Sequence, residues 1–242
     1  MTQPSNDTIH PRPVTEIDAK RWLDVDLPGL EIGVAEYAEG PTGCTVFGFE
    51  RTASLQTDVR GGSPGVVGEN FPVIDAICFA GGSIYGLEAS TGAAAELFAQ
   101  KAYATTWNEI QLVAGAIVDR TGDVVRGNRD PKTGTRRRAE DIVATQGAYD
   151  PPTARARAVT GNTNLTLLVT DQKLDSLQLR SIARQTHASM ARTIQPFHTR
   201  WDGDVLFAVS TQRVENPALD EVSLGIVASE IAWDAALSCF DP

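Results

Sequence analysis

The chain has 242 residues, of which 42% are hydrophobic and 21% are charged, as is typical of a folded globular protein. Asp and Glu number 31 against 21 Lys and Arg, and this net charge of −10 argues against a nucleic-acid-binding protein, because phosphate binding needs a positive surface. The cysteines, Cys44, Cys78 and Cys239, form no Cys-x-x-Cys pair, so the sequence favours neither a zinc ribbon nor a disulfide framework. We expect Cys78, which lies within an apolar run, to be a buried thiol.

The chain shows no sign of a membrane segment. The first thirty residues contain no apolar core of a secretory leader, and no stretch of about 18 apolar residues occurs anywhere. We therefore expect a cytoplasmic protein without a membrane partner.

In chain order, the hydrophobic pattern predicts strands that alternate with helices. Strands are expected at 31–37, 44–49, 73–79, 110–118, 165–170 and 205–209, and helices at 84–101, 175–192 and 219–237. The run 73–79 is continuously apolar, which indicates a strand covered on both faces. Ser83 is expected to be the N-cap of the first helix. This order of elements places the chain in the α/β or layered α+β class, as a single domain over residues 1–242.

One region, from residue 120 to 157, departs from this pattern. It is rich in Gly, Pro and Thr and carries nine basic residues against five acidic ones. The basic stretch 126–138 could hold an anionic partner, but a solvated connecting loop accounts for it more simply in a chain of net negative charge.

Gly81, Gly82 and Ser83 follow the apolar strand and form a tight turn before the helix. The turn lacks the spacing of a dinucleotide fingerprint, the Lys of a phosphate loop and the second Gly of a nucleophile elbow. Its backbone N–H groups could hold an anion or a carbonyl oxygen, or the glycines could serve close packing.

The sequence gives no indication of a metal or cofactor site. His10, His187 and His198 are scattered, without a second histidine at ligand spacing. Asp202-Gly203-Asp204 has the start of a calcium loop, but Arg213 stands where that loop requires Glu. We expect neither a metal nor a cofactor.

Several short segments resemble the DmpA-type aminopeptidase family of self-cleaving N-terminal-nucleophile amidohydrolases. They are Arg60-Gly61-Gly62, residues 80–89 (AGGSIYGLEA), Gly161-Asn162-Thr163, Pro196-Phe197-His198-Thr199 and Asp202-Gly203-Asp204. Three further segments resemble the 6-aminohexanoate-oligomer (nylon-oligomer) hydrolases within that family, namely residues 39–43, 125–128 and 230–234. Each motif is modest alone, but their shared order along the chain makes the resemblance specific. It covers about residues 25–130 and 160–240.

The resemblance implies that the chain cuts itself between Asn162 and Thr163. Fragments 1–162 and 163–242 would stay associated, and Thr163 would then carry both a nucleophilic hydroxyl and a free α-amine. An α-amine has a pKa of about 7.7–8.0, so that it can act as a general base beside its own hydroxyl near neutral pH.

By the same resemblance, Asp202 and Asp204 would orient the new terminus. Gly81, Gly82 and Ser83 are the candidates to contact the substrate or its oxyanion, through the free backbone N–H groups of their turn. The fold would be a four-layer αββα sandwich, and the processed pairs would form a homo-oligomer, with tetramers common in the family. The substrates would be short peptides or oligomers of ω-amino acids such as 6-aminohexanoate.

The chain also departs from the family pattern. After residues 110–118 it passes directly to Asp119-Arg120-Thr121-Gly122, where family members continue through a long glycine-rich segment. The family's catalytic Tyr, Lys and Asn have no counterpart, and the Asn belongs to an oxyanion hole, in which one donor is worth ~3–4 kcal/mol. A shortened relative that keeps the fold without processing itself is therefore an alternative, and an anion-binding module acting through residues 126–138 is another.

Overall fold

A computed structural model describes residues 25–37, 42–118, 163–192, 194 and 197–238 of the chain. Its strands are β1 (Leu30–Tyr37), β2 (Thr42–Val59), β3 (Val66–Val67), β4 (Val73–Ala80), β5 (Val113–Ile117), β6 (Leu165–Gln172) and β7 (Val205–Val214). Its α-helices are α2 (Glu88–Gln100), α5 (Ser176–Ser189) and α6 (Glu221–Ser238), and its 3-10 turns are η1 (Ser83–Leu87), η2 (Trp107–Glu109) and η3 (Met190–Arg192). Within these described ranges, no helix is long and apolar enough to span a membrane.

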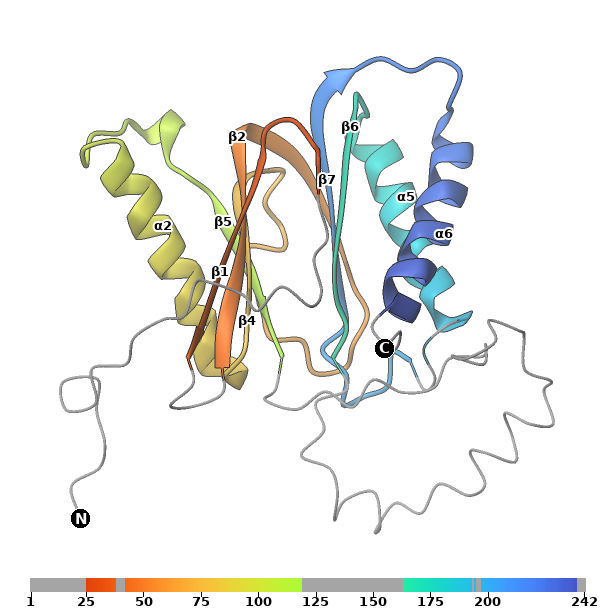
Figure 1. Cartoon of the computed structure of the whole chain (residues 1–242), viewed down its shortest axis with the longest axis horizontal. Coiled ribbons are helices and arrows are strands. Elements are labelled where there is room, and N and C mark those ends of the chain that lie inside the picture. The colour runs from red at the N-terminus through yellow and green to blue at the C-terminus, as the bar shows by residue number, and fades with distance from the viewer. Residues whose placement is uncertain (1–24, 38–41, 119–162, 193, 195–196, 239–242) are drawn as a thin grey trace, which may run out of the picture.

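The strands form one sheet in the order β3-β5-β4-β2-β7-β6, with β1 paired to β2. The long strand β2 belongs to two parts of this sheet, because residues 44–48, 53 and 54 pair with β4 whereas residues 54–59 pair with β7. The register shifts between Gly48 and Ala53, and Figure 1 shows β2 curving from one part of the sheet to the other. The curve brings the two parts face to face.

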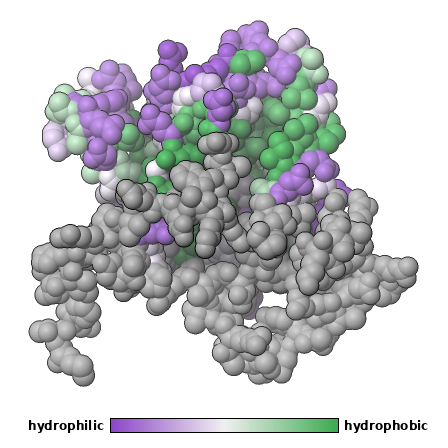
Figure 2. All heavy atoms as spheres, viewed as in Figure 1, coloured by the Kyte–Doolittle hydropathy of each residue, from purple (hydrophilic) through white to green (hydrophobic). Residues whose placement is uncertain are grey.

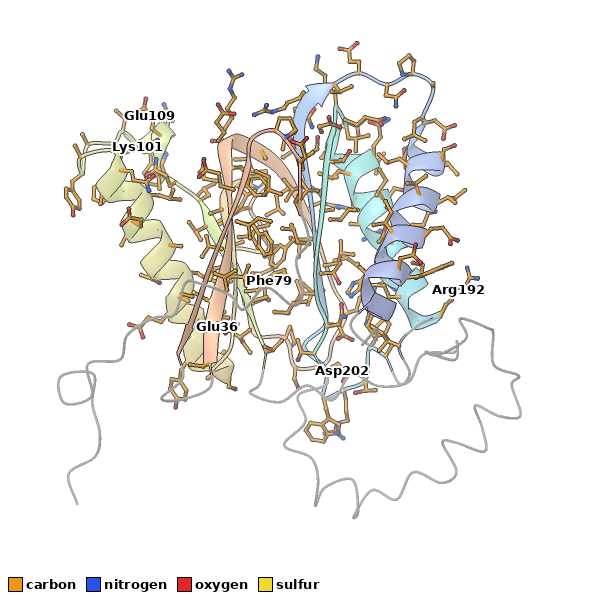
Figure 3. All side chains as sticks on the ribbon, in the orientation of Figure 1. Glu36, Phe79, Lys101, Glu109, Arg192 and Asp202 are labelled. Atoms are coloured by element: carbon orange, nitrogen blue, oxygen red, sulfur yellow. The ribbon has the colours of Figure 1, made fainter. Side chains whose placement is uncertain are left out.

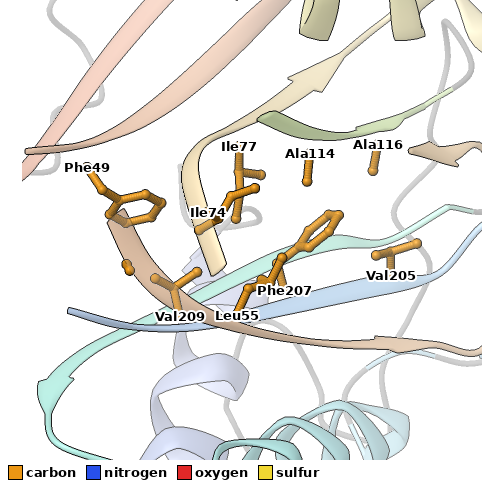
Figure 4. Packing of buried hydrophobic residues seen from close by; sticks show 10 residues of the cluster. Phe49, Leu55, Ile74, Ile77, Ala114, Ala116, Val205, Phe207 and Val209 are labelled. Carbon is orange, nitrogen blue, oxygen red and sulfur yellow. The ribbon is translucent and has the colours of Figure 1, made fainter. Parts of the chain in front are cut away.

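The main hydrophobic core fills the space between the two facing parts of the sheet. Its buried side chains come from both parts, as Figure 4 shows, and include Phe49, Leu55, Ile74, Ile77, Ala114, Ala116, Val205, Phe207 and Val209. Along β7, Phe207 points into this core, whereas its neighbours Leu206 and Ala208 pack with α5 and α6 on the opposite face. β7 is therefore covered on both faces.

Helices close the sandwich on both outer faces. α5 and α6 cover β6 and β7 through a second cluster that includes Leu179 and Ile182. α2 lies against β4 and β5 on the other side, beside a third cluster around Cys78 and Ile117. Figure 1 shows the resulting order of helix, sheet, sheet and helices. This layered arrangement confirms the predicted fold class.

Three predicted elements differ from the structure. β2 continues to Val59 because Ala53 and Leu55 alternate with polar residues and are buried, a period of two that extends the strand past residue 49. The strand predicted at 110–118 begins only at Val113. Ser83 does not cap a helix: it has a φ of 57°, η1 has no side-chain cap, and α2 begins at Glu88.

The pairing of β6 with β7 fixes the position of the predicted nucleophile. The two strands are parallel, and Leu165 pairs with Val205 at their first residues. The residues that precede each strand therefore meet at one edge of the sheet, at the end of the sandwich where Figure 3 labels Asp202.

Candidate active site

Thr163 lies beside the loop that leads into β7. Its hydroxyl oxygen accepts a hydrogen bond from the backbone N–H of Gly203, with 3.1 Å between the two atoms. The next residue, Asn164, donates its N–H to Oδ1 of Asp204 at 2.7 Å and accepts from the N–H of Val205 at 3.0 Å. The structure thus places Thr163 beside the loop that carries Asp202 and Asp204.

Asp204 is a fully buried carboxylate with three hydrogen-bond donors. Besides the N–H of Asn164 on Oδ1, its Oδ2 receives the backbone N–H of His198 at 2.9 Å and lies 2.9 Å from Nδ1 of the same residue. Donors on both oxygens fix the orientation of the carboxylate and stabilise its charge.

Asp202 is equally buried but less well satisfied. Its Oδ2 accepts the N–H of Thr199, whereas Oδ1 has no hydrogen-bond partner among the described residues. Burial raises the pKa of the Asp202 carboxyl, the Thr199 N–H opposes this, and the nearby charge of Asp204 raises the pKa further. The site therefore holds one well-bonded carboxylate and one whose negative charge lacks part of its compensation.

The Arg60-Gly61-Gly62 motif holds the loop 199–204 in place through backbone hydrogen bonds. The N–H groups of Arg60 and Gly61 donate to the carbonyl oxygen of Asp204 at 2.9 and 3.3 Å, and Gly62 donates to Thr199 at 3.1 Å. A Cβ on Gly61 would overlap the carbonyl oxygen of Asp202. Glycine is needed there because the two backbones approach too closely for a side chain.

Gly81, Gly82 and Ser83 lie at the start of η1, apart from these contacts. Gly81 donates its N–H to the carbonyl of Gly43 at 2.9 Å, and Ser83 donates to that of Val118 at 3.3 Å. Gly81 also borders a groove of about 850 Å³ between α2 and the strands β1, β2 and β4. No hydrogen bond of the described residues joins this turn to Thr163, so its contact with substrate stays a prediction.

Other predicted features lie outside the described residues. These are Asn162, the basic stretch 126–138 and Cys239. Over the described ranges, no group of three or more His, Cys, Asp or Glu side chains is arranged to hold a metal ion.

The sequence reasoning missed the part that two histidines take in this site. His198 binds Asp204, and its ring lies 4.6 Å from that of the buried His187, which in turn lies 2.9 Å from Asp58. His198 could have been noticed in the sequence, because it lies in the family-like segment 196–199 and only six residues before Asp204. No local pattern marks His187 or Asp58, because only the fold brings α5 to the end of β2.

Comparisons with known proteins agree with this arrangement. The model of peptidase family S58 matches residues 136–239. A 6-aminohexanoate-oligomer endohydrolase of Agromyces sp. (strain KY5R) is 31% identical over 327 aligned residues, which cover 97% of this chain and 90% of the relative. Another, of Kocuria sp. (strain KY2), is 30% identical over 90% of this chain and 86% of the relative. The first alignment is longer than this chain, so that relative has residues with no counterpart here.

A solved structure supports the fold. The L-aminopeptidase D-Ala-esterase/amidase from Ochrobactrum anthropi, described as a new variant among the Ntn hydrolase fold, aligns with a TM-score of 0.50 and 14% identity. The alignment covers 94% of this chain and 81% of that one. The resemblance drawn from the sequence motifs is thereby confirmed, and the chain belongs to peptidase family S58, the DmpA-type family.

Proposed function

We propose that this protein is a self-processing amide-bond hydrolase whose nucleophile is the hydroxyl of Thr163. The observation that carries the proposal is the position of this hydroxyl, which accepts the N–H of Gly203 beside two buried carboxylates, Asp202 and Asp204. In that bond the threonine oxygen is the acceptor, so its own proton stays available to a base, and the N–H of Gly203 holds the oxygen in place.

The first reaction in this proposal cuts the chain. The oxygen of Thr163 attacks the carbonyl carbon of Asn162, the C–N bond between them breaks, and the proton lost by the hydroxyl passes to the released nitrogen. Water then hydrolyses the resulting ester and regenerates the hydroxyl. The products are fragments 1–162 and 163–242, the second of which begins with the free α-amine of Thr163.

That amine is the general base in the second reaction. With a pKa of about 7.7–8.0, a substantial share is neutral at neutral pH and can take the hydroxyl proton as Thr163 attacks an amide substrate. The acyl group passes to the threonine oxygen, the protonated amine leaves, and water completes the hydrolysis. The rate gain comes from placing nucleophile and base on one residue.

Asp202 supports the formation of this amine. A buried carboxylate oxygen without a donor is costly, and Oδ1 of Asp202 has none among the described residues. An ammonium group at residue 163 would supply both a hydrogen bond and a compensating charge. We therefore assign Asp202 and Asp204 the orientation of the new terminus.

The proposed substrates are short peptides or oligomers of ω-amino acids. Two curated relatives that align over most of this chain are named 6-aminohexanoate-oligomer endohydrolases. A second candidate is a shortened relative that keeps the fold without processing itself. The length of the first alignment favours it, because the relative carries residues that this chain lacks.

The mass of the purified chain separates these candidates. We expect the wild-type protein to give two fragments that meet at 162/163, and the larger N-terminal piece to stay bound to the smaller one. Thr163→Val keeps the shape of the side chain without its hydroxyl and should give one uncut chain, whereas Thr163→Ser should still be cut. An uncut wild-type chain after long incubation would favour the shortened, inactive relative.

We also propose that the chain forms a homo-oligomer, as the resemblance implies. Val222, Ile226 and Ile231 of α6 are more than half exposed, and Figure 2 shows hydrophobic residues gathered on the side where α6 lies. Exposed apolar patches of this kind often mark protein interfaces. Light scattering during gel filtration should give a mass above that of one chain, and Ile226→Glu should lower it.

A further inference from the structure

Two imidazole rings lie in contact next to Asp204. The rings of His187, from α5, and His198, from the loop before β7, meet edge to face with 4.6 Å between their centroids. His187 is completely buried, and Phe197 stacks on His198 at 3.7 Å between centroids. The mechanism proposed above uses neither histidine.

Each ring binds one carboxylate through its Nδ1 atom. Nδ1 of His198 lies 2.9 Å from Oδ2 of Asp204, and Nδ1 of His187 lies 2.9 Å from Oδ2 of Asp58. Asp58 in turn accepts from Nε of Arg60 at 2.7 Å. The pairs His198–Asp204 and His187–Asp58 therefore have the same arrangement, and they lie next to each other between the end of β2, α5 and the loop 197–204.

The Nε2 atoms of both rings are buried and have no hydrogen-bond partner among the described residues. Because an ionised carboxylate offers no proton, Nδ1 of His198 must be the donor toward Asp204. A neutral ring then leaves only a lone pair at Nε2, whereas a protonated ring would leave an N–H and part of a positive charge without a partner. Burial of an unpaired charged donor costs much more than burial of a lone pair.

The charged groups around His198 act in both directions. Burial lowers the pKa of His198, Asp204 opposes this, and the charges of His187 and Arg60 lower the pKa further. Asp202 also lies in this cluster, since the charge of His198 affects the pKa of the Asp202 carboxyl. The environment as a whole favours the neutral ring with its proton on Nδ1.

We propose that His198 is a positioning residue of the Thr163 site, which in its neutral form holds Asp204 against the N–H of Asn164 by donating from Nδ1. His187, fixed by Asp58 and Arg60, packs against the ring and opposes its second protonation. The inference rests on the proposed function for its effect on catalysis, because Asn164 directly follows the nucleophile. The Nδ1 proton itself can be tested without activity.

Substitutions at residue 198 test the donor. His198 has a φ of 59°, a conformation that Asn and Gly adopt with little strain. His198→Asn places an amide nitrogen at the position of Nδ1 and should keep the self-cleavage rate within about threefold, whereas His198→Gly has no donor and should slow it about 100-fold, the cost of a misplaced catalytic group. Circular dichroism and the melting temperature control for folding of both variants.

The pH profile separates positioning from a structural role. A protonated ring still donates from Nδ1 but buries a second N–H at Nε2, which has no partner among the described residues. We expect this to displace the ring from Asp204 and to slow cleavage at low pH. His198→Asn cannot be protonated, so this acid limb should be absent in the variant and present in the wild type. Equal rates for the Asn and Gly variants, or an acid limb unchanged in His198→Asn, would overturn the proposal.

The ring proton can be observed directly in the uncut Thr163→Val chain by long-range ¹H–¹⁵N spectroscopy of the imidazoles. We expect His198 to carry its proton on Nδ1 at pH 7, and its titration to move to higher pH in His187→Asn, which keeps a donor toward Asp58 but cannot be charged. A proton on Nε2, or an unchanged titration, would contradict the assignment. If the wild-type chain never cuts itself, the proposed function fails, and this spectrum still decides the state of His198.

Discussion

Gly203 and Thr163 approach each other too closely for a side chain at residue 203. The N–H of Gly203 donates to the hydroxyl oxygen of Thr163 at 3.1 Å, and a Cβ on Gly203 would lie 2.8 Å from that oxygen and 3.2 Å from the methyl carbon of Thr163. The N–H of the glycine thus holds the nucleophile, and a side chain at residue 203 would force one of the two residues to shift.

From this contact we expect Gly203→Ala to slow self-cleavage by about 100-fold, because the added methyl group displaces the attacking oxygen. Intact mass followed over time measures the rate. Gly92→Ala is the matched control, since a Cβ at Gly92 meets nothing within 4 Å, and it should cleave at the wild-type rate. Equal rates for both variants would show that the position of this hydroxyl is not critical.

At Gly61 two backbone segments also approach closely, namely the segment that follows β2 and the loop 199–204. A Cβ there would overlap backbone atoms of Asp202 and Asp204, which cannot rotate away as a flexible side chain can. We expect Gly61→Ala to lower the free energy of unfolding by about 2 kcal/mol or more, as strain of this kind commonly does. Urea unfolding measures the loss. Gly33→Ala on β1, where nothing lies within 4 Å, should change stability little.

The sequence predicted most of the elements because their signals are local. The apolar runs 73–79 and 205–209 correspond to β4 and β7. Asp175 caps α5 with its carboxylate, as residues of this type do at the start of a helix. Thr163, Asp202 and Asp204 meet because β6 and β7 are parallel neighbours, which is consistent with the family resemblance.

The features of the fold and of the site that the sequence did not predict depend on contacts between distant segments. The curve of β2 places one strand in both facing parts of the sheet, and a polar-rich sequence after Phe49 does not reveal this before its partners are known. The contact between His187 and His198 joins α5 to the loop before β7. Ser83 failed as an N-cap because Gly82 takes a φ of 91° and the chain makes a 3-10 turn before α2 begins. Local propensity cannot anticipate such tertiary constraints.

Cys78 provides a test of the packing beneath α2. Its side chain is buried, and burial raises the pKa of the thiol to about 12, with a further contribution from Cys44. Since only the thiolate reacts quickly, we expect Cys78 to resist iodoacetamide at pH 8 in the folded protein and to react fully in denaturant. Peptide mass spectrometry identifies the modified residue. Rapid labelling of Cys78 in the native state would contradict this packing.

His198 predicts how stability changes with pH. Because burial lowers its pKa, the unfolded chain binds a proton as the pH falls below about 6.5, before the folded chain does. The free energy of unfolding should therefore decrease with falling pH from about 6.5 until the folded-state pKa is reached. Urea unfolding of the Thr163→Val chain at a series of pH values measures this decrease. His198→Asn in the same chain should flatten it, and an unchanged slope would show that another group is responsible.

The raised pKa of Asp202 predicts the opposite pH dependence of the free energy of unfolding. It also predicts that this residue lowers stability while it serves function. Its raised pKa means that the folded chain binds a proton more readily than the unfolded chain, so stability falls as the pH rises from about 4 through the folded-state pKa. Above that pKa the buried anion destabilises the uncut protein. In the Thr163→Val chain, Asp202→Asn should therefore raise the melting temperature by roughly a few degrees at pH 7, and this gain should vanish toward pH 4.

The same Asp202→Asn substitution in the wild-type chain should slow the appearance of the 163–242 fragment about tenfold or more, because the charge that would receive the new ammonium group is lost. Calorimetry and intact mass measure the two effects on one variant. Asn keeps an oxygen for the N–H of Thr199, so the loop itself should be preserved. Lower stability at pH 7 would mean that Asp202 is held as a well-compensated anion, and fast cleavage would mean that its charge takes no part in the reaction.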